Sequence, residues 1–210
     1  MNKEKIYIFD TTLRDGAQTQ GVDFSLNEKE KIAKSLDNLG VDYIEGGWPG
    51  ANPTDTEFFN KDQNFKNANL TAFGMTKKSE HSAKNDPMLS SLINSKSSSV
   101  CLFGKSWDFH VDVALGISND QNLENISESA KHIVNSGKEF IFDAEHFFDG
   151  YKTNPEYAIS CLKAAYDNGA RWIILCDTNG GTLPHEISKI VEEVTKYIPC
   201  LLYTSDAADE

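Results

Sequence analysis

The sequence contains no apolar run close to the roughly 20 residues that are needed to cross a membrane. Its four cysteines are scattered, and no two form a Cys-x-x-Cys pair, which argues against a zinc site and against a disulfide framework. No glycine-rich Walker or dinucleotide-binding fingerprint is present. Basic residues are in the minority, with 20 Lys and Arg against 32 Asp and Glu. We therefore expect neither a membrane nor a nucleic acid as partner, although a local basic site can still hold an anionic substrate.

The start of the chain and its composition favour a protein of the cytoplasm. Residues 1–5 lead directly into an expected strand, without the apolar segment of a signal peptide. Hydrophobic residues make up 39% and charged residues 25% of the 210 residues, which is ordinary for a globular protein. This length is compatible with one domain.

A unit of helix, glycine, strand and acid recurs along the chain. In each copy a glycine closes a helix, a short apolar strand follows, and an acid marks the end of the strand. The strands of the three copies are 41–44, 140–142 and 172–176, and the acids are Glu45, Asp143 and Asp177. Further strands are expected at 6–9, 70–73 and 100–103, with helices near 27–39, 54–65, 80–94, 121–135, 155–168 and 184–197. This alternation predicts an α/β fold with a parallel sheet, either a barrel or an open doubly wound sheet.

The first expected strand runs into a segment that combines an arginine, an acid and a glycine. Arg14 and Asp15 follow the apolar run, and Gly16 gives the backbone freedom for the exit. A carboxylate at the end of a strand can bind a hard divalent cation, and a guanidinium can bind a substrate carboxylate or stabilise an enolate. The segment therefore indicates a metal site that binds an acid. The alternative is an Asp-Gly turn beside a surface arginine.

Four segments carry a resemblance to a known family. Asp10–Gly16 resembles the signature of the metal-dependent aldolase-type superfamily that includes the 2-isopropylmalate, homocitrate and citramalate synthases and 3-hydroxy-3-methylglutaryl-CoA (HMG-CoA) lyase. The segments 43–55, 144–152 and 175–182 resemble the citramalate synthase branch of that superfamily. The resemblance covers residues 5–199, with the four motifs in family order.

The resemblance selects the barrel over the open sheet. It implies a TIM (β/α)8-type barrel, in which the loops after the strands gather at one face. A complete barrel typically needs about 250 residues. This chain has 210 residues and six expected strands and helices, so we expect an incomplete barrel with six β/α units.

The last residues depart from the family's pattern. In the family the seventh strand ends in a His-x-His pair that supplies two metal ligands, whereas residues 200–210 contain no histidine. Codons for the stretch Cys-Leu-Leu-Tyr-Thr-Ser-Asp-Ala-Ala-Asp-Glu can be chosen to spell a widely used sequencing-transposon adapter. We therefore predict a partial catalytic barrel over 1–199 and a non-native tail over 200–210. A natural acidic tail is the alternative.

The resemblance implies roles for four residues near the first two strands. Asp15 is the expected ligand of a divalent metal ion, which would be Mg, Mn or Zn. Arg14 would position and polarise the keto oxygen of a 2-oxo acid, and Glu45 would hold the guanidinium by an ion pair. A purely structural salt link is the alternative for Glu45. Gln18 is expected to line the site because of its place in the motif.

Three later residues complete the expected site. Glu145 would take part in proton transfer, or else is a solvated loop carboxylate. Thr178 would donate a hydrogen bond to the carboxylate of the oxo acid, although Asp177 and Thr178 are equally suited to capping a helix. Lys105 could contact the phosphates of coenzyme A, or be an ordinary loop lysine.

The activity that the resemblance implies is a Claisen-type acyltransfer in the biosynthesis of isoleucine and other branched-chain amino acids. Acetyl-CoA loses a methyl proton, its enolate attacks the metal-polarised ketone of pyruvate, and hydrolysis of the thioester releases (R)-citramalate and CoA. Phe73, Phe103 and Phe147 are the expected walls of the pyruvate pocket. The alternatives are a 2-isopropylmalate or homocitrate synthase and a carbon–carbon lyase of the HMG-CoA lyase type.

A reading of another class is a truncated, non-catalytic barrel fragment. Without the His-x-His strand we expect weak metal binding, unpaired sheet edges and no synthase activity in the 210-residue chain. We expect the full-length protein to be a homodimer.

Overall fold

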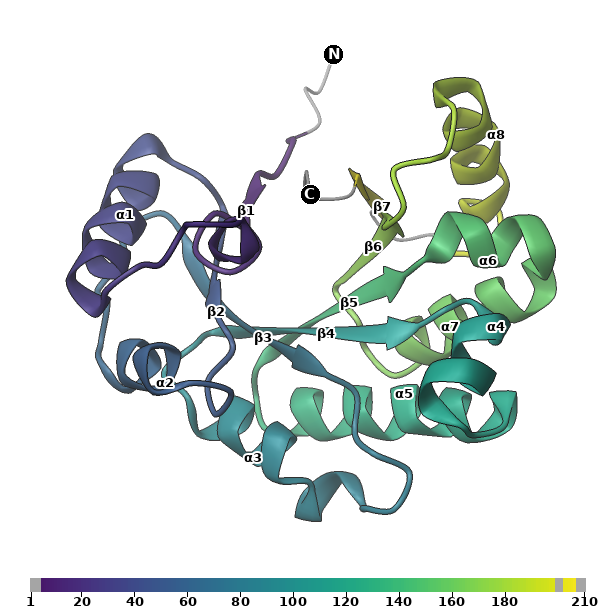
Figure 1. The fold of residues 1–210 in the computed structure, drawn as a ribbon, viewed down its shortest axis with the longest axis horizontal. Coiled ribbons are helices and arrows are strands. Elements are labelled where there is room, and N and C mark those ends of the chain that lie inside the picture. The colour runs from purple at the N-terminus through teal and green to yellow at the C-terminus, as the bar shows by residue number, and fades with distance from the viewer. Residues whose placement is uncertain (1–4, 199–201, 207–210) are drawn as a thin grey trace.

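The computed structural model describes residues 5–198 and the backbone of residues 202–206, and its strands form one curled parallel sheet (Figure 1). The strands are β1 (Phe9–Asp10), β2 (Tyr43–Gly47), β3 (Asn69–Met75), β4 (Ser99–Lys105), β5 (Glu139–Glu145), β6 (Trp172–Asp177) and β7 (Leu202–Asp206). Each strand pairs in parallel with the next in the sequence. The strand order therefore follows the chain without the reversal of a doubly wound sheet, as in a TIM barrel.

The helices lie on the outer, convex side of this sheet (Figure 1). They are α1 (Leu26–Leu39), α2 (Pro53–Asn60), α3 (Pro87–Asn94), α4 (Asp108–His110), α5 (Asn119–Asn135), α6 (Phe147–Thr153), α7 (Pro155–Tyr166) and α8 (Pro184–Val194). Shorter helical turns occur at Gly16–Gln18, Ala83–Asn85 and Val111–Leu115. No helix in the described part of the chain is long and apolar enough to span a membrane.

The sheet is part of a barrel, as the sequence predicted. Within the described residues β1 and β7 do not pair with each other, so the sheet has two free edges. The buried apolar residues form two clusters, one between the sheet and the helices and one inside the curl. The inner cluster consists of Tyr43, Phe73, Cys101, Ile141, Trp172 and Ile174. Burial on both faces explains why the strands are nearly continuous apolar runs.

Several expected boundaries are wrong for identifiable reasons. The expected strand at 6–9 is reduced to Phe9 and Asp10, and Ile6 and Ile8 are 85% and 55% exposed beside the free edge of the sheet. The expected helix over 80–94 begins only at Pro87, because the Asp86 carboxylate accepts hydrogen bonds from the first N–H groups of α3. The structure also adds α6, which the sequence did not predict.

The expected non-native tail lies largely outside the described residues. Its described part, Leu202–Asp206, forms β7 and pairs in parallel with β6 over five residues. This is the position of a seventh barrel strand. The foreign origin of residues 200–210 stays a prediction.

Gly150 in α6 provides a sharp test of how the helices pack on the loops. A Cβ atom there would collide with the backbone oxygen of Ser106 and lie 2.9 Å from the Cα of Trp107. Alanine normally stabilises a helix by about 1 kcal/mol relative to glycine. We expect the opposite sign for Gly150→Ala, a loss of about 1–3 kcal/mol in the free energy of unfolding, because backbone atoms cannot move aside.

The matched control is Gly181→Ala, since a Cβ atom there meets nothing within 4 Å. Denaturant unfolding of both variants should separate them. Equal stability of the two variants would show that α6 does not pack against the 106–107 backbone as described.

Candidate functional site

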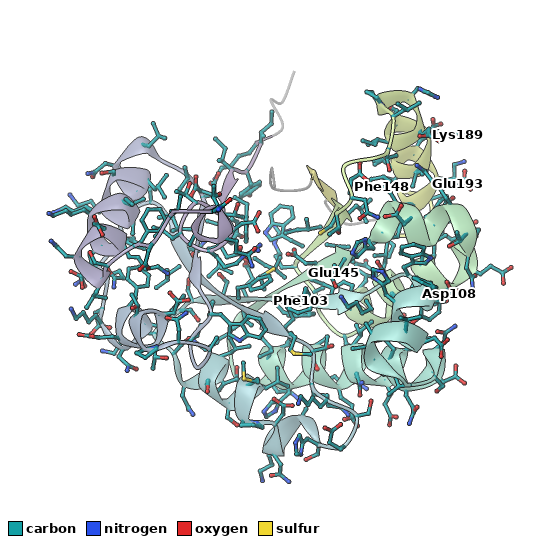
Figure 2. All side chains as sticks on the ribbon, in the orientation of Figure 1. Phe103, Asp108, Glu145, Phe148, Lys189 and Glu193 are labelled. Carbon is teal, nitrogen blue, oxygen red and sulfur yellow. The ribbon has the colours of Figure 1, made fainter. Side chains whose placement is uncertain are left out.

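A cavity of about 690 Å³ opens at the carboxyl ends of the strands. Figure 2 shows Phe103 and Glu145 beside the strands within the curl, whereas Lys189 and Glu193 project from α8. Five of the seven expected site residues line this cavity: Arg14, Asp15, Gln18, Glu145 and Thr178. The other two, Glu45 and Lys105, contact lining residues from behind. The topology therefore brings the expected residues together, as convergent strand ends require.

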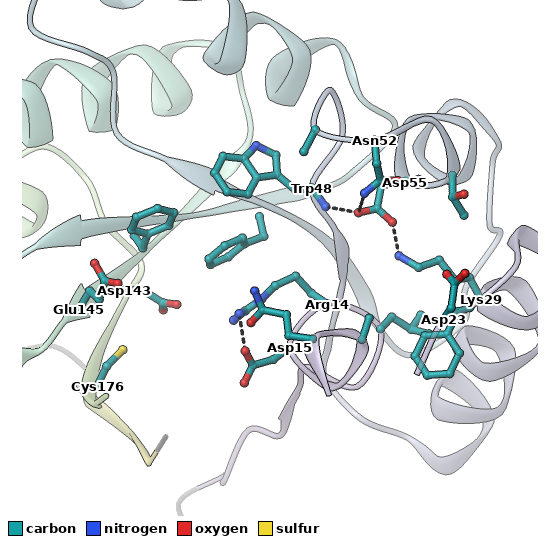
Figure 3. Close-up of a pocket in the computed structure, with 18 of the residues that line it drawn as sticks. Arg14, Asp15, Asp23, Lys29, Trp48, Asn52, Asp55, Asp143, Glu145 and Cys176 are labelled. Carbon is teal, nitrogen blue, oxygen red and sulfur yellow. Dashed lines mark hydrogen bonds and ion pairs between the residues drawn. The ribbon is translucent and has the colours of Figure 1, made fainter. Parts of the chain in front are cut away.

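The Arg14 side chain is fixed on three sides. Its Nε donates to Oε2 of Glu45 at 2.5 Å. Its Nη1 donates to Oδ1 of Asp15 at 2.6 Å (Figure 3). The guanidinium carbon lies 3.9 Å from the centre of the Phe73 ring. A planar cation stacked on a ring and tied at two edges has one orientation, so its remaining N–H groups point in a defined direction.

The turn that carries Arg14 and Asp15 is built by its own sequence. The Asp10 carboxylate accepts a hydrogen bond from the N–H of Thr12 at 3.0 Å, and the Thr11 carbonyl accepts from the N–H groups of Arg14 and Asp15 at 3.0 and 2.8 Å. Leu13, between the polar residues, is fully buried in the outer cluster. Local hydrogen bonds and one apolar anchor thus set both functional side chains at the mouth of the sheet.

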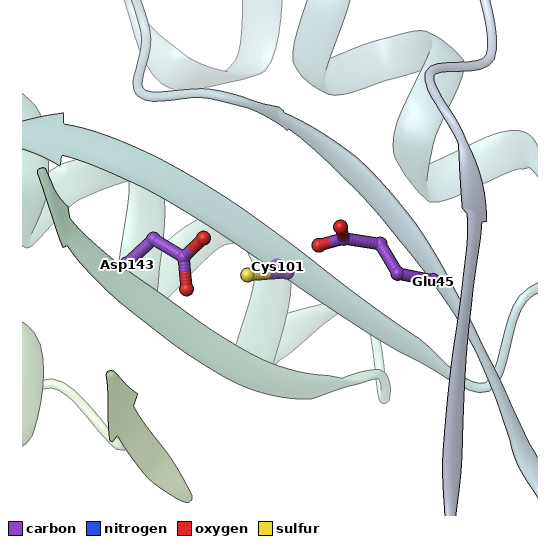
Figure 4. A group of neighbouring side chains, drawn as sticks. All are labelled: Glu45, Cys101 and Asp143. Atoms are coloured by element: carbon purple, nitrogen blue, oxygen red, sulfur yellow. The ribbon is translucent and has the colours of Figure 1, made fainter. Parts of the chain in front are cut away.

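Two buried carboxylates lie beneath the arginine. Glu45 of β2 and Asp143 of β5 point toward each other with Cys101 of β4 between them, and their ligand atoms lie within 4.8 Å of one another (Figure 4). Burial raises the pKa of Glu45 to about 7 although Arg14 opposes the shift. Burial likewise raises the pKa of Asp143 to about 6 against the pull of Arg14. Several carboxylates thus surround one guanidinium, and protonation of the buried carboxylates neutralises part of the excess negative charge.

The side chains of Glu45, Cys101 and Asp143 are better suited to holding protons than to binding a metal ion. Burial raises the pKa of the Cys101 thiol well above its usual range, so the sulfur is a protonated, poor ligand. Asp15 is the better candidate ligand, because its side chain is 24% exposed at the cavity and Arg14 contacts only one of its oxygens. No histidine lines the cavity in the described part of the chain, so the residues present supply an incomplete ligand set.

Glu145 and Lys105 form an ion pair at the ends of β5 and β4. The two residues are directly opposite in the parallel register, which brings the ammonium onto the carboxylate. Glu145 lines the cavity and is therefore not an isolated solvated carboxylate. The pairing gives Lys105 a partner that the sequence did not identify.

Thr178 and Asp177 have separate tasks. The hydroxyl oxygen of Thr178 accepts a hydrogen bond from the N–H of His146 at 2.8 Å, which leaves the hydroxyl hydrogen able to donate into the cavity. His146 has a left-handed backbone with φ of 55°, and this conformation turns the chain from β5 into α6. Asp177 instead accepts from the N–H and hydroxyl groups of Thr182 and braces the loop before α8.

Several residues of the cavity have no signal in the sequence, and one expected wall residue lies outside the cavity. Phe147 is fully buried in the outer cluster and is not a wall of the cavity, because the turn at His146 directs it toward the helices. Trp48 lines the cavity with Phe73 and Phe103. Asp143 could have been found from the two-residue period of a strand, which places it on the same face as Glu145. The other missed lining residues include the polar Asp23, Lys29, Asn52, Thr54 and Asp55, and also Cys176.

Comparison with known proteins gives consistent matches over most of the chain. A sequence model of the HMGL-like family matches residues 5–205. An (R)-citramalate synthase from Aquifex aeolicus is 55% identical over 193 residues, which are 91% of this chain and 37% of that protein. A 2-isopropylmalate synthase from Shouchella clausii is 33% identical over 195 residues, 92% of this chain and 37% of that protein.

The fold has solved relatives at lower identity. The HMG-CoA lyase of Bacillus subtilis superposes with a TM-score of 0.77 at 17% identity, over 94% of this chain and 66% of that chain.

An (R)-citramalate synthase from Sulfolobus acidocaldarius is 48% identical over 94% of this chain but only 38% of that protein. This chain spans little more than a third of the length of the curated synthases that it matches.

The raised pKa of Glu45 predicts a pH-dependent stability difference. A carboxyl group whose pKa is higher in the folded state contributes stability that is present below its ordinary pKa and lost as pH rises through about 7. From pH 5 to pH 8 we therefore expect the wild type to lose up to about 3 kcal/mol in the free energy of unfolding relative to Glu45→Gln.

Denaturant titrations of both proteins at the two pH values measure this difference. Glu186→Gln is the control, because the backbone N–H of Leu183 lowers the pKa of Glu186 and its charge is constant in this range. The raised pKa of Glu45 would be contradicted if the difference in the free energy of unfolding between wild type and Glu45→Gln did not change with pH. It would also be contradicted if wild type became more stable relative to Glu45→Gln as the pH rises.

Proposed function

The chain belongs to the HMGL-like family, and we propose that it is the catalytic barrel part of an (R)-citramalate synthase, an acyltransferase that condenses acetyl-CoA with pyruvate. Relatives named (R)-citramalate synthase are 55% and 48% identical, against 33% for a 2-isopropylmalate synthase over a similar span. That difference favours pyruvate as the 2-oxo acid.

The observation that carries this proposal is the fixed guanidinium of Arg14 at the floor of a cavity walled by aromatic rings. A 2-oxo acid presents a carboxylate and a keto oxygen, both of which accept hydrogen bonds. A guanidinium held in one orientation can bind either oxygen without reorganising as the keto oxygen becomes an alkoxide. The walls of Phe73, Phe103 and Trp48 suit a small apolar substituent.

In the proposed reaction each residue has a task that its position permits. A methyl proton leaves acetyl-CoA, the enolate carbon bonds to the keto carbon of pyruvate, and the keto oxygen takes up a proton. Water then cleaves the thioester to release CoA. Arg14 stabilises the developing negative charge, and Glu45 keeps its plane fixed. Thr178 donates its hydroxyl hydrogen to the substrate carboxylate, and Gln18 lines the entrance.

Glu145 is the proposed proton-transfer residue of this chain. Its carboxylate lines the cavity and forms an ion pair with the Lys105 ammonium. If Lys105 also contacts the phosphates of CoA, as proposed, its ammonium must interact with the phosphates and with the Glu145 carboxylate.

A divalent metal ion (Mg, Mn or Zn) is the proposed cofactor, and Asp15 is the residue that would hold it. Such an ion supplies Lewis-acid polarisation of the oxo acid. The chain offers an incomplete set of ligands, and residues 202–206 contain no histidine. We therefore propose that the 210-residue chain alone has no synthase activity, and that the other ligands lie in the part of the protein that its relatives have in addition.

The domain division is part of the same proposal: a partial barrel over 1–199 and a non-native tail over 200–210. The genomic sequence beyond codon 199 tests it. We expect a strand that ends in His-x-His, whereas the same tail followed by a native stop codon would contradict the division. A homodimer in the cytoplasm is the proposed state of the full-length protein.

Turnover of three oxo acids by the full-length protein discriminates between the candidate enzymes. Thiol release from acetyl-CoA should be fastest with pyruvate. A preference for 2-oxoisovalerate or 2-oxoglutarate would identify an isopropylmalate or homocitrate synthase, and cleavage of HMG-CoA would identify a lyase. No turnover with any of these would favour a non-catalytic barrel.

Arg14 allows charge and geometry to be separated. Arg14→Lys keeps the charge but loses the planar fork, and we expect turnover to fall roughly a hundredfold, or about 3 kcal/mol. Arg14→Ala should be slower still. Steady-state rates of the full-length variants measure this, and near-wild-type turnover by Arg14→Lys together with lost thermal stability would make Arg14 a structural partner of Glu45.

Asp15 is tested through the metal. Asp15→Ala should lower turnover by about three orders of magnitude and weaken the dependence on added divalent cation, whereas Asp15→Glu should retain a trace of activity. Titration of metal-depleted full-length enzyme with Mg, Mn and Zn measures both effects. Unchanged rates and an unchanged metal requirement in both variants would remove Asp15 from the metal site.

A further inference from the structure

Strand β2 ends in a bulge that redirects the chain toward the cavity. Glu45 pairs with Thr71 and Gly47 with Ala72, so Gly46 is the extra residue. A Cβ atom on Gly46 would lie 2.8 Å from the Phe58 ring, and Gly47 has φ of 134°. Both positions therefore require glycine. The bulge turns the backbone so that the next residue, Trp48, lines the cavity.

A buried ion pair holds this bulge in place. Lys29 of α1 pairs with the Asp55 carboxylate of α2 (Figure 3). Its Nζ also donates to the carbonyl of Gly46 at 2.8 Å. The other oxygen of Asp55 accepts from the backbone N–H of Trp48 at 2.9 Å and from the Asn52 amide at 2.9 Å. The side chains of the pair are only 4% and 11% exposed, and the small exposed part of each lines the cavity beside Trp48.

The held tryptophan reaches the centre of the site through ring contacts. Trp48 meets Phe73 edge to face at 5.8 Å and Phe103 at 5.9 Å. These two phenylalanines stack on each other at 5.4 Å, and Phe73 also carries the Arg14 guanidinium. A shift of the Trp48 backbone would therefore change the volume beside the guanidinium.

We propose that Lys29 and Asp55 are specificity-determining positioning residues, which fix Trp48 as the wall that limits the substituent of the 2-oxo acid; this inference rests on the proposed synthase function. The pair is suited to that task because hydrogen bonds to Asp55 define the position of a backbone N–H, whereas apolar packing would let the bulge shift. Its cost is two desolvated charges.

The test is discrimination between pyruvate and 2-oxobutanoate, which is longer by one methylene, in the full-length enzyme. Two variants probe the clamp and the wall: the double change Lys29→Met with Asp55→Leu, which leaves no unpaired buried charge, and Trp48→Ala, which removes the ring alone. We expect the ratio of kcat/KM for the two acids to fall by about tenfold or more in both.

The matched control is Lys61→Met. Lys61, which follows α2, pairs with Glu30 of α1 at 2.9 Å, so this pair joins the same two helices on the surface. It should keep the wild-type ratio. Thermal unfolding of every variant separates a loss of stability, which lowers both rates together, from a loss of discrimination.

An unchanged ratio in a folded double variant would overturn the positioning role, and an unchanged ratio in Trp48→Ala would overturn the wall. Failure of the proposed function gives a different result, because the wild-type enzyme would then have a higher kcat/KM for another oxo acid than for pyruvate. The same ratio is then formed between that acid and its next larger homologue.

Discussion

The structure depends on the ion pairs of one guanidinium. Arg14 follows β1, and the carboxylates around it come from its own loop, from the neighbouring strand β2 and from the more distant strand β5. Glu45 and Asp143 are both buried inside the curl of the sheet (Figure 4). In a flat sheet β2 and β5, which have two strands between them, would be too far apart for their carboxylates to share one cation. The curl of the sheet is therefore linked to the charge balance at its mouth. Separating the strands would leave buried carboxylates without their partner.

This arrangement sacrifices stability for a fixed charge. Apolar residues of similar volume would fill the space inside the curled sheet at a lower free-energy cost than desolvated acids and a cation. Burial raises the pKa values of Glu45 and Asp143, so protons neutralise part of the excess of carboxylate over guanidinium. In return the site holds a cation whose direction is set before any substrate arrives.

The sequence predicted the order of the elements and five of the residues that line the cavity, because strand ends and short motifs are local signals. Arg14, Asp15 and Gln18 belong to one short turn, and Glu145 and Thr178 follow apolar strands that must end at the same face. The Lys105–Glu145 pair needed the strand register, which no pattern in the sequence supplies. The wall was partly wrong, because the left-handed turn at His146 sends Phe147 outward. Lys29 and Asp55 are 26 residues apart in the sequence and lie on two different helices, and charge pattern alone does not distinguish their pair from a surface pair.

A crystal structure of the full-length enzyme with pyruvate would show whether Arg14 binds the oxo acid. We expect an oxygen of pyruvate within about 3 Å of the Arg14 guanidinium, with the Thr178 hydroxyl on its carboxylate and the methyl group facing Phe73, Phe103 and Trp48. Pyruvate bound elsewhere, with the Arg14 guanidinium turned away from the substrate, would contradict it.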